Sequence, residues 1–309
     1  MPESTDVTTP SRLPSGGFER AGVGAVRWST GGVAWLRLGA WFAAFAVVAP
    51  IVSVAVSAWL GAGTALGTWA HLAETVLAET LLNTLVLCLG VGGGVAALGV
   101  GSAWLITRYE FPGRSVFEWA LVLPLAMPAY VAAYTYTDAL QYVGPVQTWL
   151  RHTFGWTRAD YWFPEVRSLG GAVAMFVLVL YPYVYMLART AFLERAGGLL
   201  EVARSMGLSP WQGFVRVSLP LARPAIAAGV ALALMEALAD FGTVSYFAVQ
   251  TFTTGIYRAW FSLGDRAAAA QLALVLLAFV GLVLAAERSL RGRARFDDAS
   301  LRRSGSSRV

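Results

Sequence analysis

Two carboxylates near the end of an apolar segment are the strongest candidates for chemistry in this sequence. Glu236 and Asp240 lie four residues apart, so a helix would place both side chains on one face. A charged side chain in the middle of a membrane costs about 2.5–3.5 kcal/mol, so it normally faces protein or water. One interpretation is that this face lines a solute path. The other is structural: Glu236 pairs with a polar neighbour such as Asn83, and Asp240 lies at the membrane surface.

A second possible site is the stripe formed by Tyr130, Tyr134 and Asp138, which recur every four residues. Phenol and carboxylate oxygens are hard ligands that suit a hard cation on a transport path. Tyrosines near the end of a membrane span also act as anchors at the lipid–water interface. Both interpretations remain open from the sequence.

Several kinds of chemistry are excluded by missing residue types. Every basic residue is Arg and none is Lys, which excludes a P-loop for nucleotide phosphates. Cys88 is the single cysteine, so an internal disulfide or a cysteine-based zinc site is excluded. The two histidines, His71 and His152, leave little for acid–base or metal chemistry. We therefore expect no catalytic residue, metal or cofactor in this chain; if ATP is used, another chain must bind it.

The composition is that of a helical membrane protein. The chain has 309 residues, of which 57% are hydrophobic and 13% charged, whereas a soluble domain is about 25% charged. Six apolar runs approach the roughly 20 residues that cross a bilayer. They are Leu38–Trp59, Leu81–Thr107, Val116–Thr137, Leu169–Ala188, Pro224–Phe241 and Ala267–Ala286. We expect an all-α polytopic protein with about six transmembrane helices within residues 33–290.

The arginines predict the orientation in the membrane. If the N-terminus is cytoplasmic, 18 of the 23 arginines fall on the inner side, as the positive-inside rule requires. Both termini are therefore expected in the cytoplasm. Residues 1–32, rich in Ser, Thr, Gly and Pro, are expected to be a disordered tail without a cleaved signal, and residues 291–309 a basic tail.

The second apolar run is rich in glycine. Gly90, Gly94 and Gly99 are among six glycines in this run. Small residues let transmembrane helices approach closely, so this run is expected to pack tightly against a neighbour.

The inner loop of residues 191–223 carries clear helix signals. A first helix is expected over Leu199–Met206, ended by Gly207 in a left-handed conformation. Ser209, Pro210 and Gln212 then form a capping box that begins a second helix leading into the fifth span. Such a bent element can dock an amphipathic helix into a groove on a cytoplasmic partner. Alternatively, it lies on the bilayer surface.

The same loop resembles the EAA loop of ABC importer permeases of the MetI-like superfamily. The matching residues are Glu201-Val202-Ala203, Gly207 and Val217-Ser218-Leu219-Pro220, with Val202 replacing the usual Ala. The resemblance implies a MetI-like bundle whose cytoplasmic coupling helix contacts a separate ATPase through Glu201, Ala203 and Gly207, with Arg204 nearby. It also implies an extracytoplasmic solute-binding protein as partner and a place in a bacterial or archaeal plasma membrane.

Further segments are similar to the N-terminal half of ferric-iron permeases, so ferric iron is the implied solute, with thiamine or another small solute as the alternative. They are residues 108–114, 123–131, 161–164, 181–185 and 239–244. Those permeases usually carry two six-helix halves in one chain, whereas this sequence holds one. A homodimer or pairing with a second permease chain is therefore expected, and a truncated product is also possible.

Two other classes of membrane protein fit the sequence less well than a permease. An ion-coupled secondary transporter normally has internal repeats around a midplane site, and no clear repeat is visible. The sequence contains no serine or zinc motif of an intramembrane enzyme.

The outer loop of residues 141–167 is rich in aromatic residues. It fits a surface that docks a binding protein or a surface that lies on the outer leaflet. No feature indicates nucleic-acid binding.

Overall fold

The computed structural model describes the backbone of residues 30–61 and 77–305, with most side chains between 35 and 289. Its contacts divide the chain into two units, residues 1–50 and 51–309, each of which is described by itself. Helix α1 (Thr30–Leu60) contains Pro50, where the two units meet. The expected disordered tail falls almost wholly outside the described residues.

The second unit contains helices and no strand among its described residues. The long helices are α3 (Leu77–Arg108), α7 (Leu169–Ala191), α10 (Leu219–Ala239) and α13 (Arg266–Gly305). The short helices are α4 (Arg114–Ala120), η1 (Leu123–Ala126), α5 (Ala129–Leu140), α6 (Pro145–Phe154), η2 (Phe192–Ala196), α8 (Gly197–Ser205), α9 (Pro210–Gly213), η3 (Phe214–Ser218), α11 (Gly242–Tyr246), α12 (Phe252–Tyr257) and η4 (Arg258–Ser262).

The expectation of about six spans is confirmed. Five helical segments are long and apolar enough to cross a membrane, or six if one bent pair is a single span. The five are 37–60, 77–108, 169–194, 210–239 and 266–289. The last helix continues beyond the expected end at Ala286 to Gly305.

The expected third span, Val116–Thr137, is wrong as one continuous helix. Segments 114–126 and 129–154 are bent by 100° at the intervening residues. Pro128 precedes α5, and Met127 before it takes an extended backbone with φ −109° and ψ 126°. A proline disfavours the helical conformation in the residue before it, so the chain turns here.

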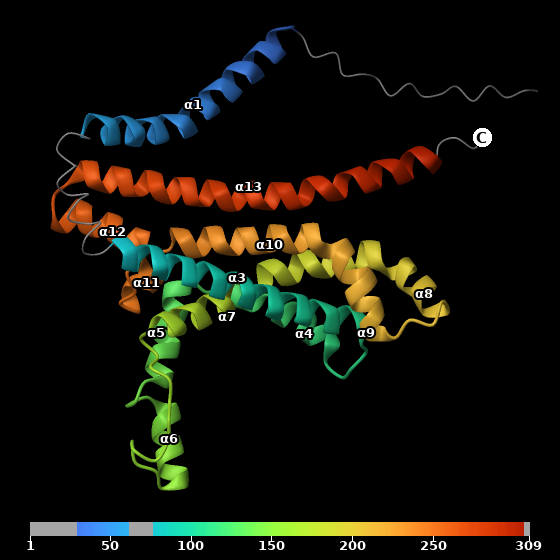
Figure 1. The fold of residues 1–309 in the computed structure, drawn as a ribbon, viewed down its shortest axis with the longest axis horizontal. Coiled ribbons are helices and arrows are strands. Elements are labelled where there is room, and N and C mark those ends of the chain that lie inside the picture. The colour runs from blue at the N-terminus through green and yellow to red at the C-terminus, as the bar shows by residue number, and fades with distance from the viewer. Residues whose placement is uncertain (1–29, 62–76, 306–309) are drawn as a thin grey trace, which may run out of the picture. The chain divides into compact units, whose positions relative to one another are not determined.

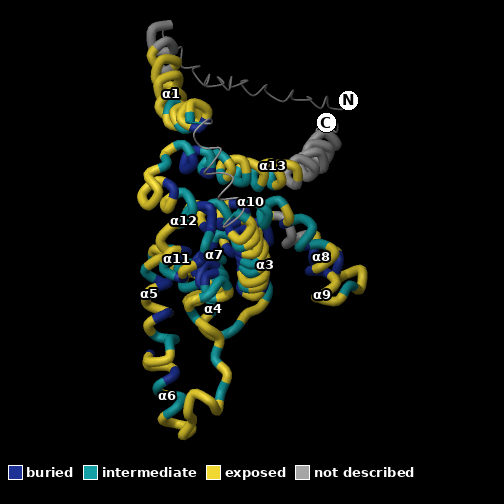
Figure 2. The backbone as a smooth tube through the Cα atoms, turned by 60° about the vertical axis from the view of Figure 1, so that its left-hand side comes forward, coloured by how far each residue is buried: buried dark blue, intermediate teal, exposed yellow. Residues whose placement is uncertain are grey.

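Helix α7 forms the centre of the bundle, between α3 and α10, as the buried positions in Figure 2 show. A Cβ atom on Gly90 would lie 2.8 Å from Val173, and one on Gly99 2.6 Å from Val184. Likewise, a Cβ on Gly229 of α10 would lie 2.7 Å from the Val184 Cα. The expectation that glycines allow close helix packing is confirmed.

The short elements gather at opposite ends of this bundle. Figure 1 shows α8 and α9 at one end, and α5, α11 and α12 at the other. The two groups of candidate site residues therefore lie at the two ends of the transmembrane helices.

Candidate functional site

The loop between α7 and α10 forms a rigid bend at Gly207. Gly207 has φ +83°, its N–H donates to the Arg204 carbonyl (2.9 Å), and the Leu208 N–H donates to the Ala203 carbonyl (3.1 Å). These two bonds make a Schellman motif, which satisfies carbonyl groups at the end of α8. The predicted left-handed stop at Gly207 is confirmed.

The second arm of the bend begins with the predicted capping box. The Ser209 N–H donates to Gln212 Oε1 (3.1 Å), and the Gln212 N–H donates to Ser209 Oγ (3.3 Å). Pro210 occupies the first turn. From there the helical backbone runs through a π turn, η3, into α10, so residues 210–239 form one continuous segment.

An aromatic cluster holds this loop against the bundle. The ring of Trp104 at the end of α3 lies 4.6 Å from that of Phe214 and 5.7 Å from that of Phe192, centre to centre. All three side chains are buried. They come from residues far apart in the sequence, so no local pattern predicts that they meet. Sequence analysis missed this cluster for that reason.

The outward side of α8 is apolar. Leu199, Val202 and Met206 are 52%, 56% and 76% exposed, and their spacing of three and four places them along one side of the helix. Leu200, on the opposite side, is 5% exposed. We call Leu199, Val202 and Met206 the α8 stripe. A stripe of exposed apolar residues on a helix held in place is the form of surface that docks into a partner's groove.

The residues that the resemblance assigns to contact with the ATPase differ in their exposure to solvent. Arg204 and Gly207 are exposed, next to the α8 stripe. Ala203 is 6% exposed and therefore faces the interior of the loop rather than its surface. The Glu201 side chain lies outside the described residues.

An ion pair anchors α4 to α7 at the same end of the bundle as this loop. Arg189 Nη2 of α7 contacts Glu118 Oε1 of α4, and the Tyr185 hydroxyl donates to the Glu118 carbonyl (2.9 Å). Both charged side chains are partly buried, at 29% and 38% exposure. The pair fixes α4 one turn before α7 enters the bent loop, and its residues are too far apart in sequence to be predicted as partners.

At the other end, Glu236 and Asp240 lie on the last turn of α10, where the Asp240 N–H donates to the Glu236 carbonyl (3.1 Å), so the helical spacing of four is kept up to Asp240. Helix α10 ends at Ala239, and Asp240 has an extended backbone with ψ 126°. Its carboxylate accepts the Thr243 N–H (2.6 Å), and its carbonyl accepts the Thr253 hydroxyl (3.1 Å). Aspartate favours such turns because its side chain bonds the backbone nearby. Glu236 remains on the helix and is exposed.

The tyrosine stripe lies on the exposed side of α5. Tyr130 and Tyr134 are 58% and 62% exposed, and Asp138 is exposed further along the helix. The Tyr134 ring lies 6.0 Å from that of Tyr246 in α11, so this stripe begins beside the turn that follows α10. Asn83, the remaining candidate, donates its amide to the Gln250 carbonyl (3.1 Å).

Two further observations concern the interior of the bundle and its polar side chains. An apolar cavity of about 960 Å³ lies between α3, α10 and α13, and Gly92, Ala96 and Ala231 are among its lining residues. Among the described side chains, no group of three or more His, Cys, Asp or Glu residues converges to hold a metal ion. The arrangement is that of a helical bundle with the exposed α8 stripe at one end and a polar turn at the other.

Comparison with known proteins identifies the family. Residues 93–294 match the family described as binding-protein-dependent transport system inner membrane component. The chain is 33% identical over 218 residues to an Fe(3+)-transport system permease protein of Haemophilus influenzae, which covers 70% of this chain and 38% of that protein. It is 36% identical over 176 residues to a probable sulfate transport system permease protein of Chlorokybus atmophyticus, covering 57% and 59%.

A third relative is the molybdenum transport system permease protein of Escherichia coli, 28% identical over 192 residues, covering 60% of this chain and 81% of that one. The chain thus spans less than two thirds of the iron and sulfate permeases that it matches. Among solved structures, a chain of a bacterial alginate ABC transporter superimposes with a TM-score of 0.68 at 16% identity, covering 84% of this chain and 94% of that one. A family match over more than half of the chain, together with this fold, shows that the protein belongs to the binding-protein-dependent transport system inner membrane components, the MetI-like permeases.

Proposed function

We propose that the chain is the permease subunit of an ABC importer and that its α8 stripe docks on a cytoplasmic ATPase subunit. The observation that carries this proposal is the exposed apolar stripe on a helix whose position is fixed from behind. The Schellman motif and capping box hold the bend, and the aromatic cluster holds the bend on the bundle. Family membership supports the same role.

This geometry suggests how a movement of the ATPase would be transmitted to the transmembrane helices. Closure of the ATPase on ATP would push α8, and the push would pass through α9 and η3 into α10 without a flexible link. The chain itself then performs no chemical step. The bundle switches between two openings because packed helices move as units rather than deforming continuously. The arginine distribution supports a cytoplasmic position for this loop and for both termini.

The exposed Glu236 supports a second permease half in the working assembly. Leu232 and Glu236 lie four apart on the outward side of α10, and both are exposed in the single chain. A carboxylate facing lipid is costly, so this side would instead face a water-filled path between two halves. The partner is a second copy of this chain or a different permease chain, and solute would arrive on an extracytoplasmic binding protein.

Ferric iron is the solute that we propose, because the matched Haemophilus protein is named for Fe(3+) transport. A second candidate is a tetrahedral oxyanion, since the sulfate and molybdenum permeases match at 36% and 28% identity. Uptake of radioactive iron, sulfate and molybdate by cells with and without the chain separates these candidates. Iron uptake that is lost on deletion supports the proposal, and loss of sulfate or molybdate uptake alone contradicts it.

The docking role is tested with matched variants at one position. Val202→Glu places a charge in the α8 stripe, whereas Val202→Ile keeps the surface apolar. The tagged chain, extracted from its own membrane, should retain its ATPase subunit with Val202→Ile and lose it with Val202→Glu. ATP hydrolysis by the purified chain alone, or equal ATPase retention by both variants, would contradict the proposal.

A further inference from the structure

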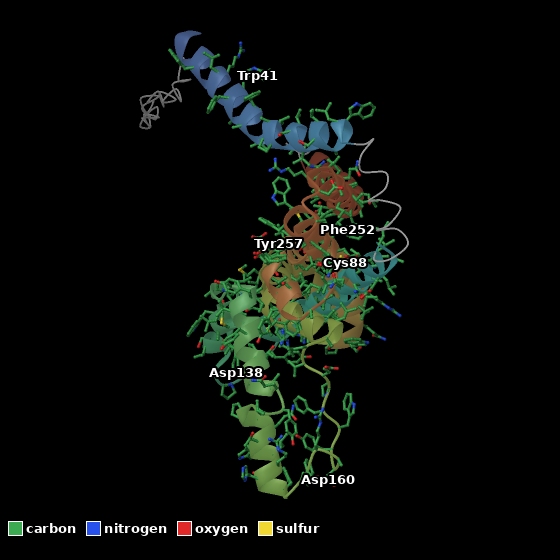
Figure 3. The ribbon with its side chains drawn as sticks, turned by 90° about the vertical axis from the view of Figure 1, so that its left-hand side faces the viewer. Trp41, Cys88, Asp138, Asp160, Phe252 and Tyr257 are labelled. Atoms are coloured by element: carbon green, nitrogen blue, oxygen red, sulfur yellow. The ribbon has the colours of Figure 1, made fainter. Side chains whose placement is uncertain are left out.

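Residues 141–168 form a projecting hairpin, here called the arm, at the end of the bundle opposite the α8 stripe. Helix α6 leads outward from α5, and residues 155–168 return beside it. Figures 1 and 2 show the arm running across the direction of the long helices rather than along it. In Figure 3, Asp138 lies at its base and Asp160 near its far end. Because the long helices cross the membrane, the arm runs parallel to the membrane plane.

The polar groups on one side of α6 are satisfied within the arm. The Tyr161 hydroxyl donates to Gln147 Oε1 (2.7 Å), and the Gln147 amide donates to the Leu140 carbonyl (2.7 Å). Arg151 Nη1 donates to the Tyr161 oxygen (3.1 Å), and its guanidinium carbon lies 4.1 Å from the Tyr142 ring centre. These contacts join α6 to the returning segment, so the arm has a fixed shape with a defined inner side.

Exposed apolar side chains lie in the turn before α6 and along the first part of its outer side, which ends in the exposed polar residues His152 and Thr153. Val143, Val146 and Trp149 are spaced by three residues and are 75%, 38% and 62% exposed. Trp162 on the returning segment is 85% exposed. A polar hollow of about 560 Å³ lies between the base of the arm and its returning segment, with Arg158 and Arg167 among its lining residues. The arm is therefore two-sided, with a polar hollow and an apolar ridge, Val143, Val146 and Trp149.

Three observations indicate what covers the ridge. The arm lies at the level where the long helices end, which is the level of the lipid–water interface. Tryptophan and tyrosine concentrate at that interface, and a helix lying in it combines an apolar side with arginines. Finally, α12 lies at the same end of the bundle in Figure 1, and Tyr257 of α12 and Trp260 and Phe261 of η4 are also exposed.

We propose that the arm lies in the phospholipid surface of the leaflet opposite the α8 stripe, with Val146 and Trp149 inserted at the acyl boundary and the Asp160 turn in water. Anchored in this way, the arm resists tilting of α5 and so supports the polar turn at the end of α10. This inference does not depend on the solute or on the ATPase.

Nitroxide labels measure the depth of the arm directly. In the full chain with Cys88→Ser, one label is attached at Val146→Cys on the ridge and one at Ala159→Cys in the exposed turn. Val143→Cys provides a second ridge site in case one ridge variant misfolds, and circular dichroism checks that each variant keeps its helices. The chain is placed in nanodiscs of phosphatidylethanolamine and phosphatidylglycerol. The relaxation of each label is then measured once with oxygen and once with a water-soluble nickel chelate.

Oxygen dissolves in lipid and the nickel chelate in water, so the ratio of their effects reports depth. We expect the ratio at Val146→Cys and Val143→Cys to be several-fold higher than at Ala159→Cys. Equal ratios at the ridge and the turn would place the arm in water and overturn the proposal. Ridge labels shielded from both reagents would also overturn it, because a protein surface would then cover the ridge.

Discussion

Leu200 of α8 packs directly on Gly213 of α9, so closely that a Cβ atom on Gly213 would lie 2.6 Å from Leu200 Cδ1. This contact sets the angle of the bent loop from its inner side, while the Schellman motif and capping box set it along the backbone. With Leu200 buried against Gly213, the α8 stripe lies on the outward side of the helix.

Enlarging Gly213 should loosen this angle. Gly213→Val adds methyl groups against Leu200, and such overpacking costs about 1–3 kcal/mol. Nitroxide labels at Val202→Cys and Val215→Cys in a Cys88→Ser chain should then give a broader distribution of label-to-label distances in pulsed electron paramagnetic resonance. Gly101→Val is the control, because a Cβ there meets nothing within 4 Å. An unchanged distribution in Gly213→Val would show that the contact does not set the angle.

Gly207 should tolerate Asn better than Ala. At φ +83° a residue with a Cβ is strained, by roughly 1 kcal/mol for Ala, whereas Asn adopts this region more readily. Hydrogen exchange at the amides of Met206 and Leu208, which donate to Val202 and Ala203, should speed up in Gly207→Ala and change less in Gly207→Asn. Equal exchange in both variants would contradict a requirement for the left-handed backbone.

The ion pair between Glu118 and Arg189 should stabilise the bundle more than the pair between Glu110 and Arg114. The first pair is partly buried, while Glu110 is 94% exposed at 3.9 Å from Arg114. We expect Glu118→Gln to cost about 1 kcal/mol and Glu110→Gln about 0.3 kcal/mol or less. Thermal unfolding in detergent, followed by circular dichroism, compares the two; the reverse order would contradict this ranking.

Glu236 should matter for transport rather than for assembly. If the exposed side of α10 lines a path between two permease halves, Glu236→Gln removes its charge and should lower uptake several-fold without releasing the ATPase. Glu110→Gln serves as the control and should leave uptake unchanged. Glu110 is exposed and lies just after Arg108, where α3 ends. Normal uptake by Glu236→Gln would remove this residue from the proposed path.

The turn at Asp160 should loosen in acid. The Thr157 hydroxyl and backbone N–H both donate to the Asp160 carboxylate (2.7 and 2.6 Å) and hold its pKa below the ordinary value of 3.8. A lowered pKa means that the turn is complete above the ordinary value and is lost as pH falls through the lowered pKa. A label at Ala159→Cys should gain mobility only in that range, and in Asp160→Ala, which lacks the acceptor, it should be mobile at every pH.

The sequence determined the local features of this protein. The apolar runs predicted the spans, the glycines of residues 90–99 predicted close packing, and Gly207, Ser209 and Gln212 predicted the bent loop. These succeeded because a helix stop, a capping box and a hydrophobic run each depend on residues only a few positions apart. The same locality applies to Glu236 and Asp240: the hydrogen bond between their backbones keeps the helical spacing of four up to Asp240, where α10 ends.

The third span shows the limit of hydrophobicity as a guide. The run from Val116 to Thr137 is mostly apolar, with Glu118 as its single charged residue, yet Pro124 and Pro128 break it, and its second part turns by 100° into α5 and the arm. Only the tertiary structure decided that Trp104, Phe192 and Phe214 meet beneath the loop, that Glu118 pairs with Arg189, and that Ala203 faces inward while Val202 faces out. Each of these depends on how helices distant in sequence approach one another, and that approach is set by packing over the whole bundle rather than by any local pattern.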